Sequence, residues 1–163
     1  MNSVENRKKY IKAAITGAVI VSAGGLLSLV LTILTGGDFS EYHAKTCIFS
    51  PPAWLFPVVW SVLYPSIGGS AGIVSCIAEK DDPNRKKGLL LFGVMMLLNV
   101  IWSPLFFSAS AYGSAFINIV FMLILTAGTL CYFRIINRAC AVVLGVYWIW
   151  LLYSLILNAC YLF

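Results

Sequence analysis

Aromatic and amide side chains recur at helical spacing in three apolar parts of the chain. Trp60 and Tyr64 are four residues apart, so they share one face of a helix. The same spacing occurs twice more, at Asn99, Trp102, Ser103 and Phe106, and at Tyr147, Trp150, Ser154, Leu157 and Asn158. Rings placed in this way can stack on a flat aromatic ligand, while a few amides or hydroxyls orient it. These three polar-aromatic stripes are the chain's main candidates for binding chemistry.

Groups for acid, base or metal chemistry are scarce in the same parts of the chain. All six acids lie outside the apolar stretches, at Glu5, Asp38, Glu41, Glu79, Asp81 and Asp82. The only histidine, His43, lies in a polar loop without the further ligands that a metal site needs, so we predict no metal and interpret it as solvated. Hydroxyls and thiols without a neighbouring base are poor nucleophiles, and a proton-coupled pump usually carries an ionisable residue in the membrane. The residues therefore disfavour both hydrolysis and proton pumping.

The elements that position the stripes are expected to be membrane-spanning helices. The 163 residues are 61% hydrophobic and 10% charged, and the mean hydropathy is +0.92. A helix crosses a bilayer in about 20 apolar residues, and five stretches are long enough, over residues 13–34, 53–78, 88–107, 114–133 and 139–161. The first stretch is longer than the apolar core of a signal peptide and is expected to be retained. The sequence predicts one all-α integral membrane domain over residues 1–163, a five-transmembrane-helix bundle with the lipid bilayer as its solvent.

Positive charges alternate between the predicted loops. Ten of the eleven Lys and Arg residues lie before the first helix, between the second and third, or between the fourth and fifth, and only Lys45 lies on the other side. Lys and Arg are retained on the cytoplasmic side, so we predict a cytoplasmic N-terminus and an outside C-terminus, in a bacterial cell membrane. Topology also explains the net charge of +5 better than nucleic acid does, so no nucleic-acid partner is expected.

Small residues suggest close helix packing. Gly68 and Gly72 form a G-x-x-x-G pattern, which can admit another helix either within the bundle or from a second subunit of a homodimer. The five cysteines show no metal-ligand spacing, and we interpret them as small buried hydrophobes.

The stripes are expected to face the interior of the bundle. Aromatic residues that face lipid collect at the two interfaces, and an asparagine in hydrocarbon needs a partner on another helix. Two interpretations are open at this point. The stripes are ordinary packing with Asn99, Asn118 and Asn158 hydrogen-bonded between helices, or they line a ligand pocket.

Three blocks of sequence together resemble a known family. They are SPPAWLFPVVWSVLY at 50–64, LNVIWSPLFF at 98–107, and YWIW at 147–150 leading to Leu157 and Asn158. In this register they resemble the translocator protein family, also called TspO/MBR, tryptophan-rich sensory or peripheral benzodiazepine receptor proteins. The chain departs from the family at Phe49, where tryptophan is usual, at Thr46-Cys47, where Lys-Pro is usual, and at Val146, where proline is usual.

The resemblance implies a five-helix bundle, often dimeric, with a pocket below the first loop. Such pockets take porphyrins such as protoporphyrin IX and synthetic isoquinoline carboxamide or benzodiazepine ligands. Sterol binding is less well supported, because the family's sterol motif ends in a basic residue, whereas here Leu157 and Tyr161 are followed only by Leu162 and Phe163.

We predict ten ligand-binding residues. The walls are Trp60, Tyr64, Trp102, Phe106, Tyr147 and Trp150, the polar contacts Asn99 and Ser154, and the lid Trp54 and Phe49 in a loop that controls access. Porphyrin is expected as a ligand, and no cofactor is required. The expected function is that of a porphyrin sensor, regulator or carrier. One alternative is light-dependent breakdown of protoporphyrin IX through Trp60 and Trp150, and another is transport of porphyrins or other lipophiles such as sterols.

Overall fold

Five long helices form nearly all of the part of the chain that the structure describes. In the computed structural model, which describes residues 3–37 and 50–162, they are α1 (Ser3–Leu34), α3 (Leu55–Ile77), α4 (Pro83–Ser103), α5 (Tyr112–Ile136) and α6 (Arg138–Ala159). A π-helical turn, η1 (Pro104–Ser108), continues α4. Each of the five, with η1 added to α4, is long and apolar enough to cross a membrane. The predicted all-α membrane protein with five spanning helices is confirmed.

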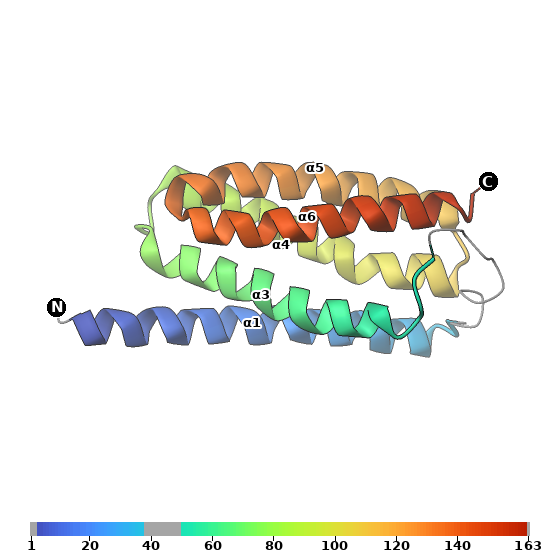
Figure 1. Cartoon of the computed structure of the whole chain (residues 1–163), viewed down its shortest axis with the longest axis horizontal. Coiled ribbons are helices and arrows are strands. Elements are labelled where there is room, and N and C mark those ends of the chain that lie inside the picture. The colour runs from blue at the N-terminus through green and yellow to red at the C-terminus, as the bar shows by residue number, and fades with distance from the viewer. Residues whose placement is uncertain (1–2, 38–49, 163) are drawn as a thin grey trace.

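The helices form a ring in which the order differs from the order in the chain. The main contacts run from α1 to α3, α6, α5, α4 and back to α1. Figure 1 shows the pair α1 and α3 along one side of the bundle, with the two chain ends at opposite ends of it. This arrangement brings α3, α4 and α6, which carry the three stripes, toward a shared interior.

Two helices begin several residues before the predicted spans, because polar residues extend a helix beyond the membrane. α1 starts at Ser3, ten residues before the predicted span, and includes the basic residues of the N-terminus. α4 starts at Pro83, where the Asp82 carboxylate accepts a hydrogen bond of 2.7 Å from the backbone N–H of Asn84. Proline at a first helical position has no N–H to leave unpaired, so Asp82 and Pro83 together specify this start.

Close backbone contact holds α1 against α3. A Cβ atom added to Gly17 would lie 2.1 Å from the carbonyl oxygen of Gly68, and one added to Gly72 would lie 2.0 Å from that of Ala13. Only glycine allows the two backbones to approach so closely. The G-x-x-x-G pattern of α3 is therefore filled by α1 of the same chain, so it does not support a dimer.

Hydroxyl groups connect α1 to α4 further along the chain. Ser28 Oγ donates to the carbonyl oxygen of Val100 at 2.8 Å, and Thr32 Oγ1 donates to Ser103 Oγ at the same distance. In hydrocarbon, such groups must find protein partners because water is absent. α1 thus contacts α3 from Ala13 to Gly25, and it contacts α4 from Gly24 to Thr32.

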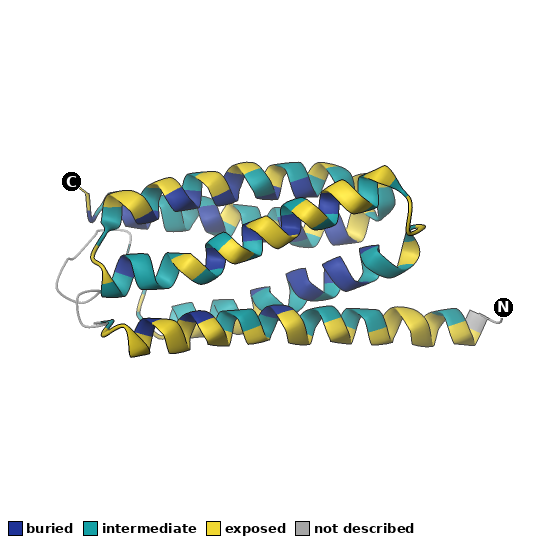
Figure 2. Ribbon diagram, turned by 180° about the vertical axis from the view of Figure 1, so that it is seen from behind, coloured by how far each residue is buried: buried dark blue, intermediate teal, exposed yellow. Residues whose placement is uncertain are grey.

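The outer surface of the bundle is apolar, as a bilayer requires. In Figure 2, α1 is exposed along most of its outer side, and its exposed residues include Ile15, Val19 and Leu26. The core lies between α3, α4, α5 and α6, where Ile67, Met95 and Tyr147 are completely buried.

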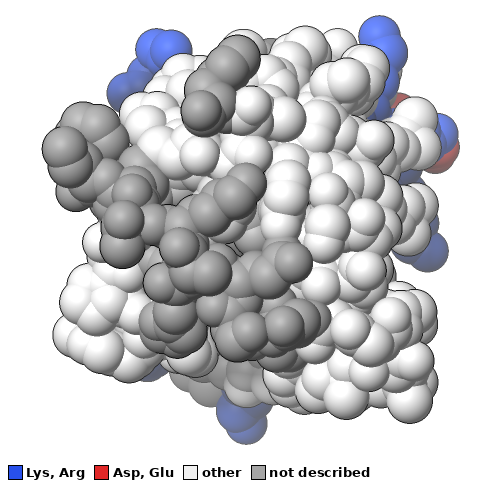
Figure 3. Space-filling model, turned by 90° about the vertical axis from the view of Figure 1, so that its right-hand side faces the viewer, with Lys and Arg blue, Asp and Glu red and all other residues white. Residues whose placement is uncertain are grey.

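Charges gather at one end of the bundle, which we call the basic end. It comprises the start of α1, the α3–α4 turn and the α5–α6 turn, and its described basic residues are Arg7, Lys8, Lys9, Lys12, Lys80, Arg85, Lys86, Lys87, Arg134 and Arg138. Lys86 forms an ion pair of 2.8 Å with Asp81 there. Viewed from the opposite end, the described surface is almost entirely uncharged, and Lys and Arg atoms appear only at the rim (Figure 3).

The interpretation of the cysteines as buried hydrophobes is wrong for most of those that the structure describes. Cys140 is buried, but Cys76 is half-buried and Cys131 is exposed. Cys160 is disulfide-bonded, and the three other described cysteines are free. The free thiols lie toward the basic end, whereas Cys160 ends α6 at the opposite end.

Candidate ligand-binding site

A chain of side-chain hydrogen bonds joins the three helices that carry the stripes. The Tyr64 hydroxyl on α3 donates to Asn99 Oδ1 on α4 at 2.9 Å, and Asn99 Nδ2 donates to the Tyr147 hydroxyl on α6. Asn99 is buried, and Tyr147 is completely so. The stripes therefore face the interior, as predicted, and the amide of Asn99 links two tyrosines.

A glycine on α1 makes room for one of these tyrosines. A Cβ atom added to Gly25 would lie 2.3 Å from Cε2 of the Tyr64 ring. The ring thus lies directly on the backbone of α1, which fixes its position relative to Asn99 on the other side. α1 therefore contributes a glycine backbone, and no side chain, to this contact.

Rings from α3 and α6 form what we call the central aromatic cluster, made of Phe56, Trp60, Tyr64, Tyr147, Trp150 and Tyr153. Trp60 stacks on Tyr64 with ring centroids 4.8 Å apart and meets Trp150 edge-on at 6.2 Å. Phe56 also meets Trp150 edge-on, at 5.9 Å. Both stacked and edge-on arrangements suit the ring quadrupoles and hold the cluster together.

One polar atom in this cluster has no partner. Trp150 Nε1 is buried and makes no hydrogen bond. By contrast, Trp148 Nε1, on the same helix, donates to the carbonyl oxygen of Leu123 at 3.1 Å. Most buried indole N–H groups are paired, so an unpaired one calls for a physical explanation. The Trp150 indole is a hydrogen-bond donor available to a ligand among aromatic rings.

Trp102 and Phe106 belong to a second group, which we call the terminal aromatic cluster, made of Trp102, Phe106, Phe107, Tyr112 and Tyr161. Trp102 stacks on Phe106 with centroids 5.1 Å apart, and Phe106 meets Tyr161 edge-on at 4.9 Å. Phe106 lies in the π-helical turn, a type of distortion that is frequent at functional sites. Trp102 Nε1 is also buried without a partner.

The ten predicted residues thus occupy different surroundings. Trp60, Tyr64, Asn99, Tyr147 and Trp150 come together, Phe106 is in the terminal cluster, and Trp102 stacks on Phe106 while also packing against the main core. Ser154 Oγ donates to the carbonyl oxygen of Trp150 in its own helix. Trp54 is 64% exposed at the start of α3, and Phe49 lies outside the described residues.

Sequence reasoning missed several rings of both clusters. Phe56 precedes Trp60 by four residues, so the same helical spacing that selected Tyr64 also indicates Phe56. Tyr153 follows Trp150 by three. The partners of Phe106 come from other elements, and only the folded chain brings Tyr112 and Tyr161 to it.

The packing interpretation also needs correction. Asn99 is hydrogen-bonded between helices, but neither side-chain polar atom of Asn158 has a partner, and Asn118 Oδ1 has none. Asn158 is only 1% exposed. Ordinary interior hydrogen bonding therefore accounts for one of the three asparagines.

Two grooves on the described surface are lined by no ring of either cluster, although Leu105 of the second groove packs against the terminal aromatic cluster. One, of about 470 Å³, lies between α1 and α3 at the basic end, and the other, of about 400 Å³, lies between α1 and η1 near the opposite end. None of the nine predicted residues that the structure describes lines either groove. The described residues also include no group of three or more His, Cys, Asp or Glu that could hold a metal ion.

Comparison with known proteins gives consistent matches. Residues 15–163 match the model of the TspO/MBR family. The chain is 29% identical over 111 residues to the tryptophan-rich protein TspO of Chlorobaculum tepidum, which covers 68% of this chain and 69% of that protein. It is 30% identical over 108 residues to the protein CrtK of Rhodobacter capsulatus, covering 66% and 67%. Over 146 residues it is 26% identical to the translocator protein of Ovis aries, covering 89% and 85%.

Proposed function

Because this chain belongs to the TspO/MBR family, we propose that it is a membrane protein that binds a tetrapyrrole such as protoporphyrin IX and acts as a sensor, regulator or carrier. The observation that carries the proposal is the buried Trp150 indole N–H, which has no partner although aromatic rings surround it. Small lipophilic drugs of the isoquinoline carboxamide type would compete for the same site.

The central aromatic cluster suits a flat ligand. Offset stacking of aromatic rings adds about 0.5 to 1.5 kcal/mol per pair beyond the burial of area. The indole rings of Trp60 and Trp150 are in edge-on contact. A tetrapyrrole that inserts between them must therefore rotate one of the two indoles, and the tetrapyrrole then stacks on the face of that indole. Trp150 Nε1 can then donate a hydrogen bond to a carboxylate of the ligand.

We predicted Asn99 as a polar contact to the ligand, but here we assign it a positioning role. Its amide is already bonded to Tyr64 and Tyr147, so it positions the two tyrosine rings and does not need to contact the ligand. Trp60, which stacks on Tyr64, is held in place through the same bonds.

We also propose that the basic end faces the cytoplasm of a bacterial cell. The Lys and Arg residues of the turns support this orientation. The state of the cysteines supports it independently, because disulfides persist in oxidising compartments and are rare in the cytoplasm. The disulfide-bonded Cys160 lies at the opposite end from the free Cys76, Cys131 and Cys140.

A second candidate function is light-dependent oxidative breakdown of the bound porphyrin by molecular oxygen. The contact between Trp60 and Trp150 favours it, since a porphyrin that touches one indole lies close to the other. Transport of porphyrins or sterols stays a prediction, and no described contact favours it.

The test is a titration of detergent-purified protein with protoporphyrin IX, followed through the Soret absorbance of the porphyrin. Saturable binding that a Trp60→Ala, Trp150→Ala double variant loses supports the proposal, and unchanged affinity in that variant contradicts the location of the site. Illuminating the complex beside free porphyrin then tests the second function. Equal bleaching with and without protein would rule out breakdown and leave binding.

A further inference from the structure

The groove at the basic end exists because α1 contacts different helices along its length. In its first half, α1 lies against α3, where Gly17 packs on Gly68. α1 approaches α4 only later, where Gly24 lies close to Val100 and Ser28 bonds to the carbonyl oxygen of the same residue. Between the basic end and that contact, α1 and α4 are separated by a groove of about 470 Å³.

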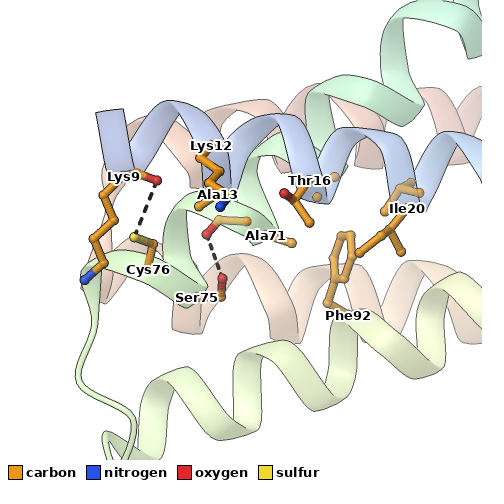
Figure 4. Close-up of a pocket in the computed structure, with 13 residues that line it drawn as sticks. Lys9, Lys12, Ala13, Thr16, Ile20, Ala71, Ser75, Cys76 and Phe92 are labelled. Carbon is orange, nitrogen blue, oxygen red and sulfur yellow. Dashed lines mark hydrogen bonds between the residues drawn. The ribbon is translucent and has the colours of Figure 1, made fainter. Parts of the chain in front are cut away.

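Thirteen residues line the groove, and Figure 4 shows how they are arranged. α1 and α3 form its two sides, and Phe92 of α4 points up from its floor toward Ile20. At the basic end of the groove, Cys76 on α3 lies against α1, with its Sγ 3.9 Å from the backbone carbonyl oxygen of Lys9. The groove is therefore built from residues of three helices.

The lining changes from charged to apolar along the groove. Lys9 and Lys12 lie at the mouth, and Ile20, Val21 and Phe92 lie further in. A helix rises about 1.5 Å per residue, so Lys12 and Ile20 are about 12 Å apart along α1. Lys12 immediately precedes the apolar stretch, which places its ammonium group at the depth of lipid headgroups.

The mouth of the groove carries a net positive charge. None of the thirteen lining residues is acidic, and Lys9 and Lys12 form no ion pair with any described residue. Glu5 lies four residues before Lys9 on the same helix face, but the only ion pair among the described residues is that of Lys86 with Asp81, and Lys12 has no acid one turn away on α1. The described part of the basic end holds ten Lys and Arg residues and four acids, so its field attracts anions.

We propose that this groove binds one anionic phospholipid from the leaflet at the basic end. Lys9 and Lys12 pair with the headgroup phosphate, and one acyl chain lies along Ile20, Val21 and Phe92. Basic sites between membrane helices recognise anionic headgroups in this way. The lipid stabilises α1 against the rest of the bundle, because it fills the space where α1 and α4 do not touch. The site shares no residue with the two aromatic clusters, so it stands independently of porphyrin binding.

The test is native mass spectrometry of the purified chain, titrated with dioleoyl phosphatidylglycerol or dioleoyl phosphatidylcholine. We expect one saturable phosphatidylglycerol, bound more tightly than phosphatidylcholine. A Lys9→Gln, Lys12→Gln double variant should lose roughly 10- to 30-fold in phosphatidylglycerol affinity. The control, Arg134→Gln with Arg138→Gln, removes the same charge from the α5–α6 turn and should retain the preference.

A second pair of variants tests the acyl chain. Thr16→Trp fills the groove without changing charge and should weaken binding of both lipids, whereas Val19→Trp, which is outside the groove on α1, should not. Equal losses in the two charge variants would mean that only net charge attracts lipid, and would overturn the site. Glycerophosphoglycerol has the same headgroup but no acyl chains. If it displaced bound phosphatidylglycerol as effectively as the intact lipid does, the role of the groove would be overturned.

Discussion

The hydroxyl of Tyr64 lies 2.9 Å from Asn99 Oδ1, and this bond joins α3 to α4 inside the membrane. Asn99 also donates to Tyr147 of α6, so one amide holds three helices. In hydrocarbon no water replaces a lost partner, and removing the amide leaves two buried hydroxyls unpaired.

Asn99→Leu is expected to destabilise the protein, and Asn158→Leu is expected to be neutral or stabilising. Both asparagines are buried, but the side chain of Asn158 has no hydrogen-bond partner. A buried polar group left unpaired costs about 1 to 3 kcal/mol of folding free energy. Asn99→Leu incurs this cost because it leaves the tyrosine hydroxyls without their partner, whereas Asn158→Leu removes an amide that is already unpaired. Thermal unfolding in detergent measures the difference. A lower melting temperature for Asn158→Leu than for Asn99→Leu would contradict our assignment of the two amides.

Trp150→Phe is expected to weaken protoporphyrin IX binding, whereas Trp148→Phe should leave it unchanged. The first substitution keeps an aromatic ring but removes the free indole N–H, and the second removes an N–H that bonds to Leu123. A hydrogen bond to a charged group contributes about 1.5 to 3 kcal/mol, so we expect an affinity loss of about tenfold or more. Porphyrin titration measures it, and melting curves separate folding defects. Equal affinities for wild type and Trp150→Phe would exclude the indole as a ligand donor.

Gly72→Ala is expected to destabilise the contact between α1 and α3, and Gly93→Ala should have the opposite effect. The added methyl group at Gly72 would lie 2.0 Å from the carbonyl oxygen of Ala13, whereas nothing lies within 4 Å of one at Gly93. Overpacking typically costs about 1 to 3 kcal/mol, and alanine is favoured over glycine in a helix by up to about 1 kcal/mol. Unfolding in increasing sodium dodecyl sulfate compares them. Unaltered stability of Gly72→Ala would show that α1 can move away from α3 freely.

Reduction is expected to make Cys160 reactive toward maleimide. In right-side-out membrane vesicles, a membrane-impermeant maleimide should label Cys160 only after mild reduction, because this residue is disulfide-bonded at the end we place outside. A thiol introduced by Arg138→Cys at the basic end should react only after the vesicles are permeabilised. Peptide mapping by mass spectrometry identifies the labelled sites. Labelling of the Arg138→Cys thiol in intact vesicles would reverse the orientation.

The sequence by itself determined the class of the protein and the helices that carry its stripes. Five apolar stretches and short charged turns leave few alternatives, because in a bilayer each backbone N–H must be satisfied within its own helix. Helical spacing also placed Trp60, Tyr64, Tyr147 and Trp150 on interior faces, since a stripe with period 3.6 is a local property.

Tertiary structure decided which of these residues meet, and which partner each polar atom finds. Spacing along α4 treats Asn99 and Trp102 alike, yet one is bonded between two tyrosines and the other belongs to the terminal aromatic cluster. Glycine patterns cannot say which helix fills them, and here α1 does so for Gly72 of α3. The groove beside Lys12 likewise arises from the changing neighbours of α1 along its length. These outcomes depend on the ring order of the helices, which is set by packing between segments far apart in the chain and leaves no periodic trace in any one of them.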